Sequence, residues 1–306
     1  MELLQKLCQI PGTSGNEGGI RDFILSYIEE NQSSWKCVPK IIHGDEIQDA
    51  VLLVFGKPRT AIIAHIDTIG FTVRYNNQVV PVGSPHMETG MVLRGADAEG
   101  EIRCKLSVVE EDDDEKLVCE FHREIERGTE LVFDFNFRES ADYVQSCYLD
   151  NRLGVWSALK VAENLENGII AFSCWEEHGG GSVPVLARII FEQYGVRQAL
   201  ISDITWVTEG VKAGQGVAIS LRDRSIPRKK FIEKIVKLAK ESDVPFQLEV
   251  EGAGGSDGKE LQSSPYPFDW CFIGAPEDNV HSPDEKVHKN DIESMVALYN
   301  FLMKKL

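Results

Sequence analysis

Short apolar runs alternate with helix-like segments along the second half of the chain, and this alternation constrains the fold more than any other feature. Unbroken apolar runs indicate buried strands, whereas apolar residues that recur every three or four positions indicate helices. The expected strands are 168–175, 199–202, 216–221 and 245–250, and the expected helices are 153–162, 183–190, 231–239 and 292–303. We therefore expect an α/β fold with a mainly parallel sheet and helices on both faces.

The middle of the chain has a different pattern. Short strand-like runs with alternating or apolar character fall at 101–109, 116–121 and 130–135. Such runs, separated by acidic or glycine-containing turns as at 110–115, are typical of an all-β unit. We predict that residues 1–74 and 144–306 form one discontinuous α/β domain. Residues 75–143 would form a small β-barrel-like domain inserted into it.

Composition excludes several classes of partner. Asp and Glu outnumber Lys and Arg by 49 to 32, which gives a formal net charge of −17. This is the wrong sign for binding nucleic acid or an anionic membrane surface. The start of the chain lacks the features of a secretory signal, and no apolar run approaches the ~20 residues of a membrane span. The seven cysteines are scattered without a Cys-x-x-Cys pair, so we expect a reducing, cytoplasmic location.

Three apolar runs lead into residues that can bind metal or move protons. The first ends at His65, with Asp67 two residues later; the second leads into Glu176 and Glu177, and the third into Asp203. Each signal is weak alone, because buried histidines and solvated acidic pairs are common. However, ligands of open α/β sheets bind at the carboxyl ends of the strands, so we expect these side chains to meet at one edge.

Asp150 and His281 carry weaker signals. Asp150 has an ordinary explanation as the cap of the helix that follows, and His281 as a loop histidine. Together with His65, Glu177 and Asp203 they would supply two imidazoles and three carboxylates without a thiolate. Such a set suits catalytic zinc, manganese or cobalt. A spare carboxylate beside two such ions could act as general base.

Seven segments of the chain resemble the tetrahedral, or deblocking, aminopeptidase family, which includes bacterial glutamyl aminopeptidases. The segments occur in order, at plausible spacing, and extend over almost the whole chain. They are residues 10–17, 64–71, 149–154, 176–177, 202–203, 255–257 and 281–285.

The resemblance implies a ligand set for two divalent ions, zinc in the first place, with cobalt or manganese as alternatives. His65, Asp150 and Asp203 would hold one ion. Asp150, Glu177 and His281 would hold the other, so that Asp150 bridges the two. The implied activity is that of a metal-dependent aminopeptidase that releases N-terminal residues from short peptides.

The same resemblance implies that Glu176 is the general base and proton shuttle and that Asp67 orients the histidine before it. The all-β insert would correspond to the dimerisation domain of the family, which predicts a homo-oligomer. Two residues beside the site, Trp175 and His178, depart from the family pattern. Two alternatives therefore stay open: a related di-zinc deacylase or carboxypeptidase, and a peptide-binding homologue with a decayed site.

Overall fold

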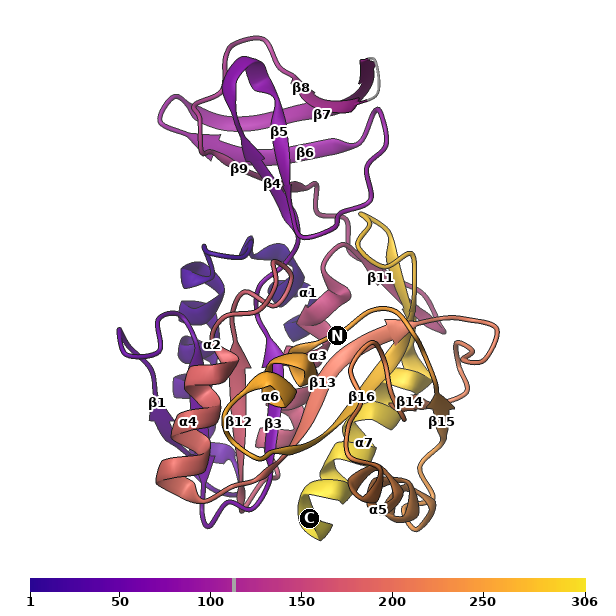
Figure 1. Ribbon diagram of the computed structural model, residues 1–306. Coiled ribbons are helices and arrows are strands. Elements are labelled where there is room, and N and C mark those ends of the chain that lie inside the picture. Colours follow the sequence, from indigo (N-terminus) through magenta and orange to yellow (C-terminus); the bar gives the residue numbers. More distant parts are fainter. Residues whose placement is uncertain (112–113) are drawn as a thin grey trace.

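Two β-sheets of different character organise the chain (Figure 1). The structure is a computed structural model and describes residues 1–111 and 114–306. Part of the acidic turn expected at 110–115 therefore lies outside the described residues. The larger sheet belongs to the main α/β unit, and the smaller sheet forms a separate unit above it in Figure 1.

The larger sheet has eleven strands. In order along the chain they are β1 (Lys40–Ile42), β2 (Val51–Phe55), β3 (Ala61–His65), β10 (Arg138–Glu139), β11 (Tyr143–Ser146), β12 (Gly168–Ser173), β13 (Gln198–Trp206), β14 (Val217–Ser220), β15 (Phe246–Glu249), β16 (Asp269–Asp278) and β17 (Glu285–His288). The spatial order is β1-β2-β12-β3-β13-β16-β17-β11-β10, and β14 joins β16 to β15 off this path.

The centre of the larger sheet is parallel. Strands β12, β3, β13 and β16 run side by side in one direction, and β3 and β12 are buried along their whole length. Antiparallel strands flank this centre, with β2 beside β12 and β17 beside β16. Strands buried on both faces read as continuous apolar runs, which is why the sequence indicated them. The expected α/β fold with a mainly parallel sheet is confirmed.

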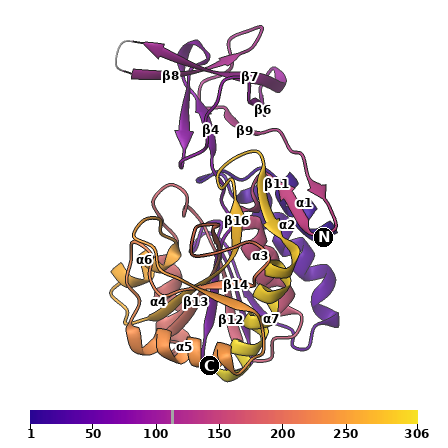
Figure 2. The ribbon, with the colours of Figure 1, turned by 90° about the vertical axis from the view of Figure 1, so that its right-hand side faces the viewer.

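Helices cover the larger sheet on both faces (Figure 2). They are α1 (Glu2–Gln9), α2 (Gly18–Asn31), α3 (Leu149–Ala162), α4 (Val183–Tyr194), α5 (Lys229–Lys240), α6 (Asp257–Ser263) and α7 (Lys289–Lys305). Helices α1, α3 and α7 pack together on one face, and α4 and α6 contact each other on the opposite face. In the part of the chain that the structure describes, no helix has the length and apolar character needed to cross a membrane.

The smaller sheet is antiparallel and has the strand order β5-β4-β9-β6-β7-β8. Its strands are β4 (Gly70–Val73), β5 (Val79–Val82), β6 (Val92–Asp97), β7 (Gly100–Glu111), β8 (Asp114–Glu120) and β9 (Glu130–Phe133). Ile102, Cys104 and Leu106 of β7 are buried, as the alternation predicted, and contribute to a separate apolar core. Strand β4 belongs to this sheet although it precedes residue 75, where the insert was predicted to begin. The exact limits of the insert stay a prediction.

Candidate metal centre

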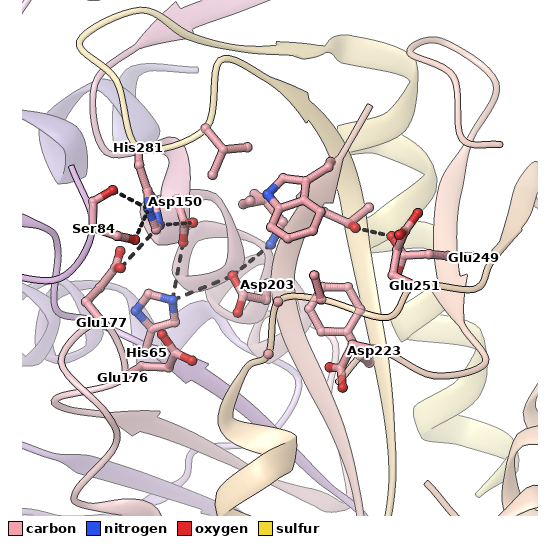
Figure 3. A pocket seen from close by; sticks show the side chains of 18 residues that line it. His65, Ser84, Asp150, Glu176, Glu177, Asp203, Asp223, Glu249, Glu251 and His281 are labelled. Atoms are coloured by element: carbon pink, nitrogen blue, oxygen red, sulfur yellow. Dashed lines mark hydrogen bonds and ion pairs between the residues drawn. The ribbon is translucent and has the colours of Figure 1, made fainter. Parts of the chain in front are cut away.

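The parallel strands bring their polar carboxyl ends to one edge of the larger sheet. His65 ends β3, and its backbone is in register with Ser173, the last residue of β12. The chain continues from β12 into Glu176 and Glu177. Asp203 lies on β13, which pairs with β3 on the other side. The expected meeting of these side chains is therefore observed (Figure 3).

Five side chains from distant parts of the sequence form two overlapping groups of possible metal ligands. The ligand atoms of His65, Asp150 and Asp203 lie within 4.8 Å of one another, and so do those of Asp150, Glu177 and His281. Asp150 belongs to both groups and turns one carboxylate oxygen to each histidine. Its Oδ1 lies 3.3 Å from His65 Nε2, and its Oδ2 lies 3.3 Å from His281 Nε2. Asp203 Oδ1 lies 3.6 Å from His65 Nε2, and Glu177 Oε2 lies 3.2 Å from His281 Nε2.

Asp67 connects the two strand ends behind this cluster. It is fully buried, and its Oδ1 lies 3.4 Å from Nδ1 of His65, the ring nitrogen that faces away from the other carboxylates. The backbone N–H groups of Glu176 and Glu177 donate to its two oxygens at 3.1 and 3.0 Å. The hydroxyl of Ser14 donates to it at 2.6 Å. Asp67 thus contacts the His65 ring and binds the backbone of the loop that carries both glutamates, and its role in orienting the ring stays a prediction.

Glu285 holds the backbone of Asp150 and His281 in place, and the sequence analysis assigned it no role. Its side chain is fully buried and accepts hydrogen bonds from the backbone N–H groups of Asp150 at 3.2 Å and His281 at 3.0 Å. His281 has φ = 62°, a backbone conformation that non-glycine residues rarely adopt. The only signal for Glu285 was its place in the segment 281–285.

The segment between β5 and β6 of the smaller sheet also reaches the cluster. The hydroxyl of Ser84 lies 3.0 Å from Nδ1 of His281, and the N–H of Gly83 donates to Nδ1 of His178 at 3.3 Å. Trp175 is 43% exposed and also has positive φ, at 71°. Trp175 and His178, the two departures from the family pattern, belong neither to the ligand groups nor to the residues that line the cavity of the cluster.

Burial and crowding of like charges shift the pKa values in the cluster. Burial raises the pKa of Asp203 to about 6 and that of Glu177 to about 7, and the nearby carboxylate of Asp150 adds to both shifts. Burial alone would lower the pKa of His281, but its hydrogen bonds to Asp150 and Glu177 raise it to about 12. The cluster carries more negative charge than its histidines neutralise, so it tends to keep protons in the absence of another cation.

This cluster fits two divalent ions. Among the described residues, the buried atoms Oε1 of Glu177 and Oδ1 of Asp150 have no hydrogen-bond partner, although Oδ1 of Asp150 lies 3.3 Å from His65 Nε2. Buried carboxylate oxygens usually have partners, so these two atoms indicate a cation that faces them. Nitrogen and oxygen donors without a thiolate suit catalytic zinc, cobalt or manganese. That these residues bind metal stays a prediction.

Glu176 stands beside the ligand groups without belonging to either of them. Its carboxylate lines the same cavity as His65, Asp150, Asp203 and His281 (Figure 3). Burial raises its pKa well above the usual range of a glutamate. A carboxyl group with a raised pKa next to a metal centre has the properties of a proton acceptor and donor.

Comparison with known proteins shows which family the sequence of this chain matches. Residues 79–298, more than half of the chain, match the family model described as M42 glutamyl aminopeptidase. A protein of Acetivibrio thermocellus that bears the name "Putative aminopeptidase" is 28% identical over 330 residues, which cover 97% of this chain and 96% of that protein.

Solved structures share the fold over the full length. The TET1 peptidase of Pyrococcus horikoshii, described as able to assemble into a tetrahedron or a large octahedral shell, has a TM-score of 0.84 at 24% identity. That match covers 100% of this chain and 99% of the other. An aminopeptidase of Desulfurococcus kamchatkensis also has a TM-score of 0.84, at 21% identity, and covers 100% of this chain and 94% of its own.

Proposed function

Because the chain belongs to the M42 glutamyl aminopeptidase family, we propose that it is a metal-dependent aminopeptidase that releases N-terminal residues from short peptides. One observation carries the proposal: two ligand groups share Asp150, and a spare glutamate, Glu176, lines the same cavity. This is the arrangement that hydrolysis of an amide bond by a two-metal site requires.

In this proposal His65, Asp150 and Asp203 hold one divalent ion, and Asp150, Glu177 and His281 hold the second. Zinc is the expected metal, with cobalt or manganese as alternatives. When bound there, such ions would polarise the scissile carbonyl and lower the pKa of the attacking water.

The residues of the chain then manage the proton. The carboxylate of Glu176 removes a proton from the attacking water while the bond between the water oxygen and the carbonyl carbon forms. It returns that proton to the nitrogen of the leaving amine as the carbon–nitrogen bond breaks. The hydrogen bonds from Glu176 and Glu177 to Asp67 keep the base and its neighbouring ligand in place.

A panel of three peptides of one sequence tests the proposal against a deacylase or a carboxypeptidase. We expect the metal-loaded protein to cleave the free peptide and its C-terminal amide at similar rates. We expect cleavage of the N-acetylated form to be about 100-fold slower or worse, since a free amine is required. Cleavage of the acetyl group itself would indicate a deacylase, and loss of cleavage on amidation would indicate a carboxypeptidase. A metal-loaded protein that binds but cleaves none of them would be a peptide-binding homologue.

Assembly and location are part of the same proposal. The P. horikoshii peptidase that shares the fold is described as able to assemble into a tetrahedron or a large octahedral shell, and we propose a homo-oligomer built through the β insert. A cytoplasmic location is proposed because all seven cysteines carry free thiols, which suits a reducing compartment.

A further inference from the structure

The cavity of the candidate metal centre continues beyond it to a second set of carboxylates. Its volume is about 270 Å³. In Figure 3 the two histidines lie at one end of the cavity, whereas Asp223, Glu249 and Glu251 lie at the other end, with Asp203 between the two sets. We call Asp223, Glu249 and Glu251 the distal acids. None of them belongs to the ligand groups of the metal centre.

Strand β13 sets the distance between the two ends of the cavity. Asp203 and Thr205 are two residues apart on this strand, so their side chains point to the same face, roughly 6.6 Å apart along the strand. The hydroxyl of Thr205 donates a hydrogen bond to Oε1 of Glu249. The carboxylate of Glu249 is therefore about one long side chain away from the metal centre.

The distal acids are largely buried and form no ion pair within the part of the chain that the structure describes. The Glu249 residue is only 3% exposed, and burial raises the pKa of its carboxyl group. Asp223 is 8% exposed, and among the described residues its carboxylate accepts a hydrogen bond from the N–H of Ser225 in its own loop. Burial raises its pKa, and the charge of the neighbouring Arg222 offsets part of that rise without forming an ion pair. Among the described residues, no lysine, arginine or histidine forms an ion pair with any of the three. Because a buried carboxylate without a cation is costly, the cavity is suited to a ligand that brings the cation.

The cavity wall also offers apolar surface. It includes Ile204, Trp206 and Phe272 in addition to the acids. Lysine and arginine side chains combine an apolar stem with a cationic end, and a tryptophan ring attracts a cation placed over its face. A glutamate side chain would face three carboxylates in this cavity, and an aliphatic one would leave their charge unpaired.

We propose, on the premise that the protein is an aminopeptidase, that the distal acids form the subsite for the side chain of a substrate's N-terminal residue and select lysine and arginine. The α-amino group is a second candidate for these carboxylates. However, it lies only two bonds from the scissile carbonyl carbon, and therefore belongs at the metal end of the cavity. The side chain is the part of the substrate that can reach Glu249.

Lysyl and norleucyl substrates with the same chromogenic leaving group test this proposal, because norleucine is lysine without its ammonium group. We expect the metal-loaded protein to favour the lysyl substrate about tenfold or more in kcat/KM. Glu251→Gln, at a half-buried position, should reduce this ratio about tenfold, and Glu249→Gln should do the same. Glu251→Lys should lower it further and raise the relative rate on a glutamyl substrate. The exposed Glu209, which does not line the cavity, provides the control: Glu209→Gln should leave the ratio unchanged.

Two results would overturn the proposal: a wild-type preference for norleucyl or glutamyl substrates, or a lysyl-to-norleucyl ratio that is the same in Glu251→Gln and Glu249→Gln as in the wild type. Equal losses on both substrates would assign the acids to the α-amino group. If the wild type cleaves no aminoacyl substrate at all, the proposed function fails, and the binding of free lysine and norleucine to the metal-loaded protein decides the subsite. Tighter binding of lysine, weakened by Glu251→Gln, would support the subsite, and equal binding would refute it.

Discussion

Replacing Glu176 with glutamine is expected to lower kcat by about 10²- to 10⁴-fold while the metal content of the protein stays unchanged. Glutamine has nearly the shape of glutamate but cannot accept a proton from the attacking water. Glu176 lies outside both ligand groups, so its loss should not release an ion. The measurement is steady-state hydrolysis of a peptide with a free N-terminus, together with metal content by mass spectrometry.

The adjacent glutamate provides the matched control. Glu177→Gln makes the same chemical change one residue away, but in a residue whose Oε2 lies 3.2 Å from His281. We expect this variant to lose metal as well as activity, and high zinc concentrations to restore part of its activity. Near-normal turnover in Glu176→Gln would show that another group moves the proton.

Replacing Asp150 with asparagine is expected to disturb both ions at once and to reduce activity by about 10³-fold or more, since each ion contributes several kcal/mol of transition-state stabilisation. Asp150 is the one residue common to the two ligand groups, with one oxygen 3.3 Å from each histidine. The neutral amide offers a single weaker oxygen donor. Metal content per chain and the rate of peptide hydrolysis are the quantities to measure.

Asp203→Asn separates this effect from general damage to the site. Asp203 belongs to only one ligand group, so its variant should lose one ion preferentially. Circular dichroism of both variants should match the wild type. An Asp150→Asn protein that retains both ions and its activity would refute the bridging role.

Part of this site could be predicted from the sequence for a clear physical reason. Strands buried on both faces give apolar runs, and parallel strands present their carboxyl ends at one edge. The ends of three apolar runs therefore predicted that His65, Glu177 and Asp203 would meet, and the structure brings them together. The expected end of the third run at residue 202 was wrong, because β13 continues to Trp206 and Asp203 lies inside it.

The remaining residues depend on contacts that local pattern does not encode. Asp150 lies in the first turn of α3, and His281 lies in the loop between β16 and β17. Only the family resemblance, now confirmed by the family match, brought these two residues into the prediction. Glu285 acts through the backbone N–H groups of these two residues, so no periodicity marks it. Glu249 reaches the cavity because β15 pairs with β14, a neighbour relation that apolar runs alone cannot specify.

The direction of the strands that flank the parallel centre could also not be predicted from the sequence pattern. A fully buried apolar run looks the same whether its neighbour is parallel or antiparallel. Strand β2 pairs antiparallel with β12 and β17 pairs antiparallel with β16, whereas β14 and β15, off the main path, pair parallel with each other. The site lies at the parallel centre, which is why its position was predictable although the direction of the flanking strands was not.

Reactivation of metal-free protein is the most direct test of the two-metal account. The protein is stripped with a chelator, dialysed and titrated with zinc while hydrolysis of a peptide with a free N-terminus is followed. The account predicts no activity in the stripped protein and a rise to a plateau at two equivalents of zinc per chain, one for each ligand group. Full activity in exhaustively stripped protein would contradict it.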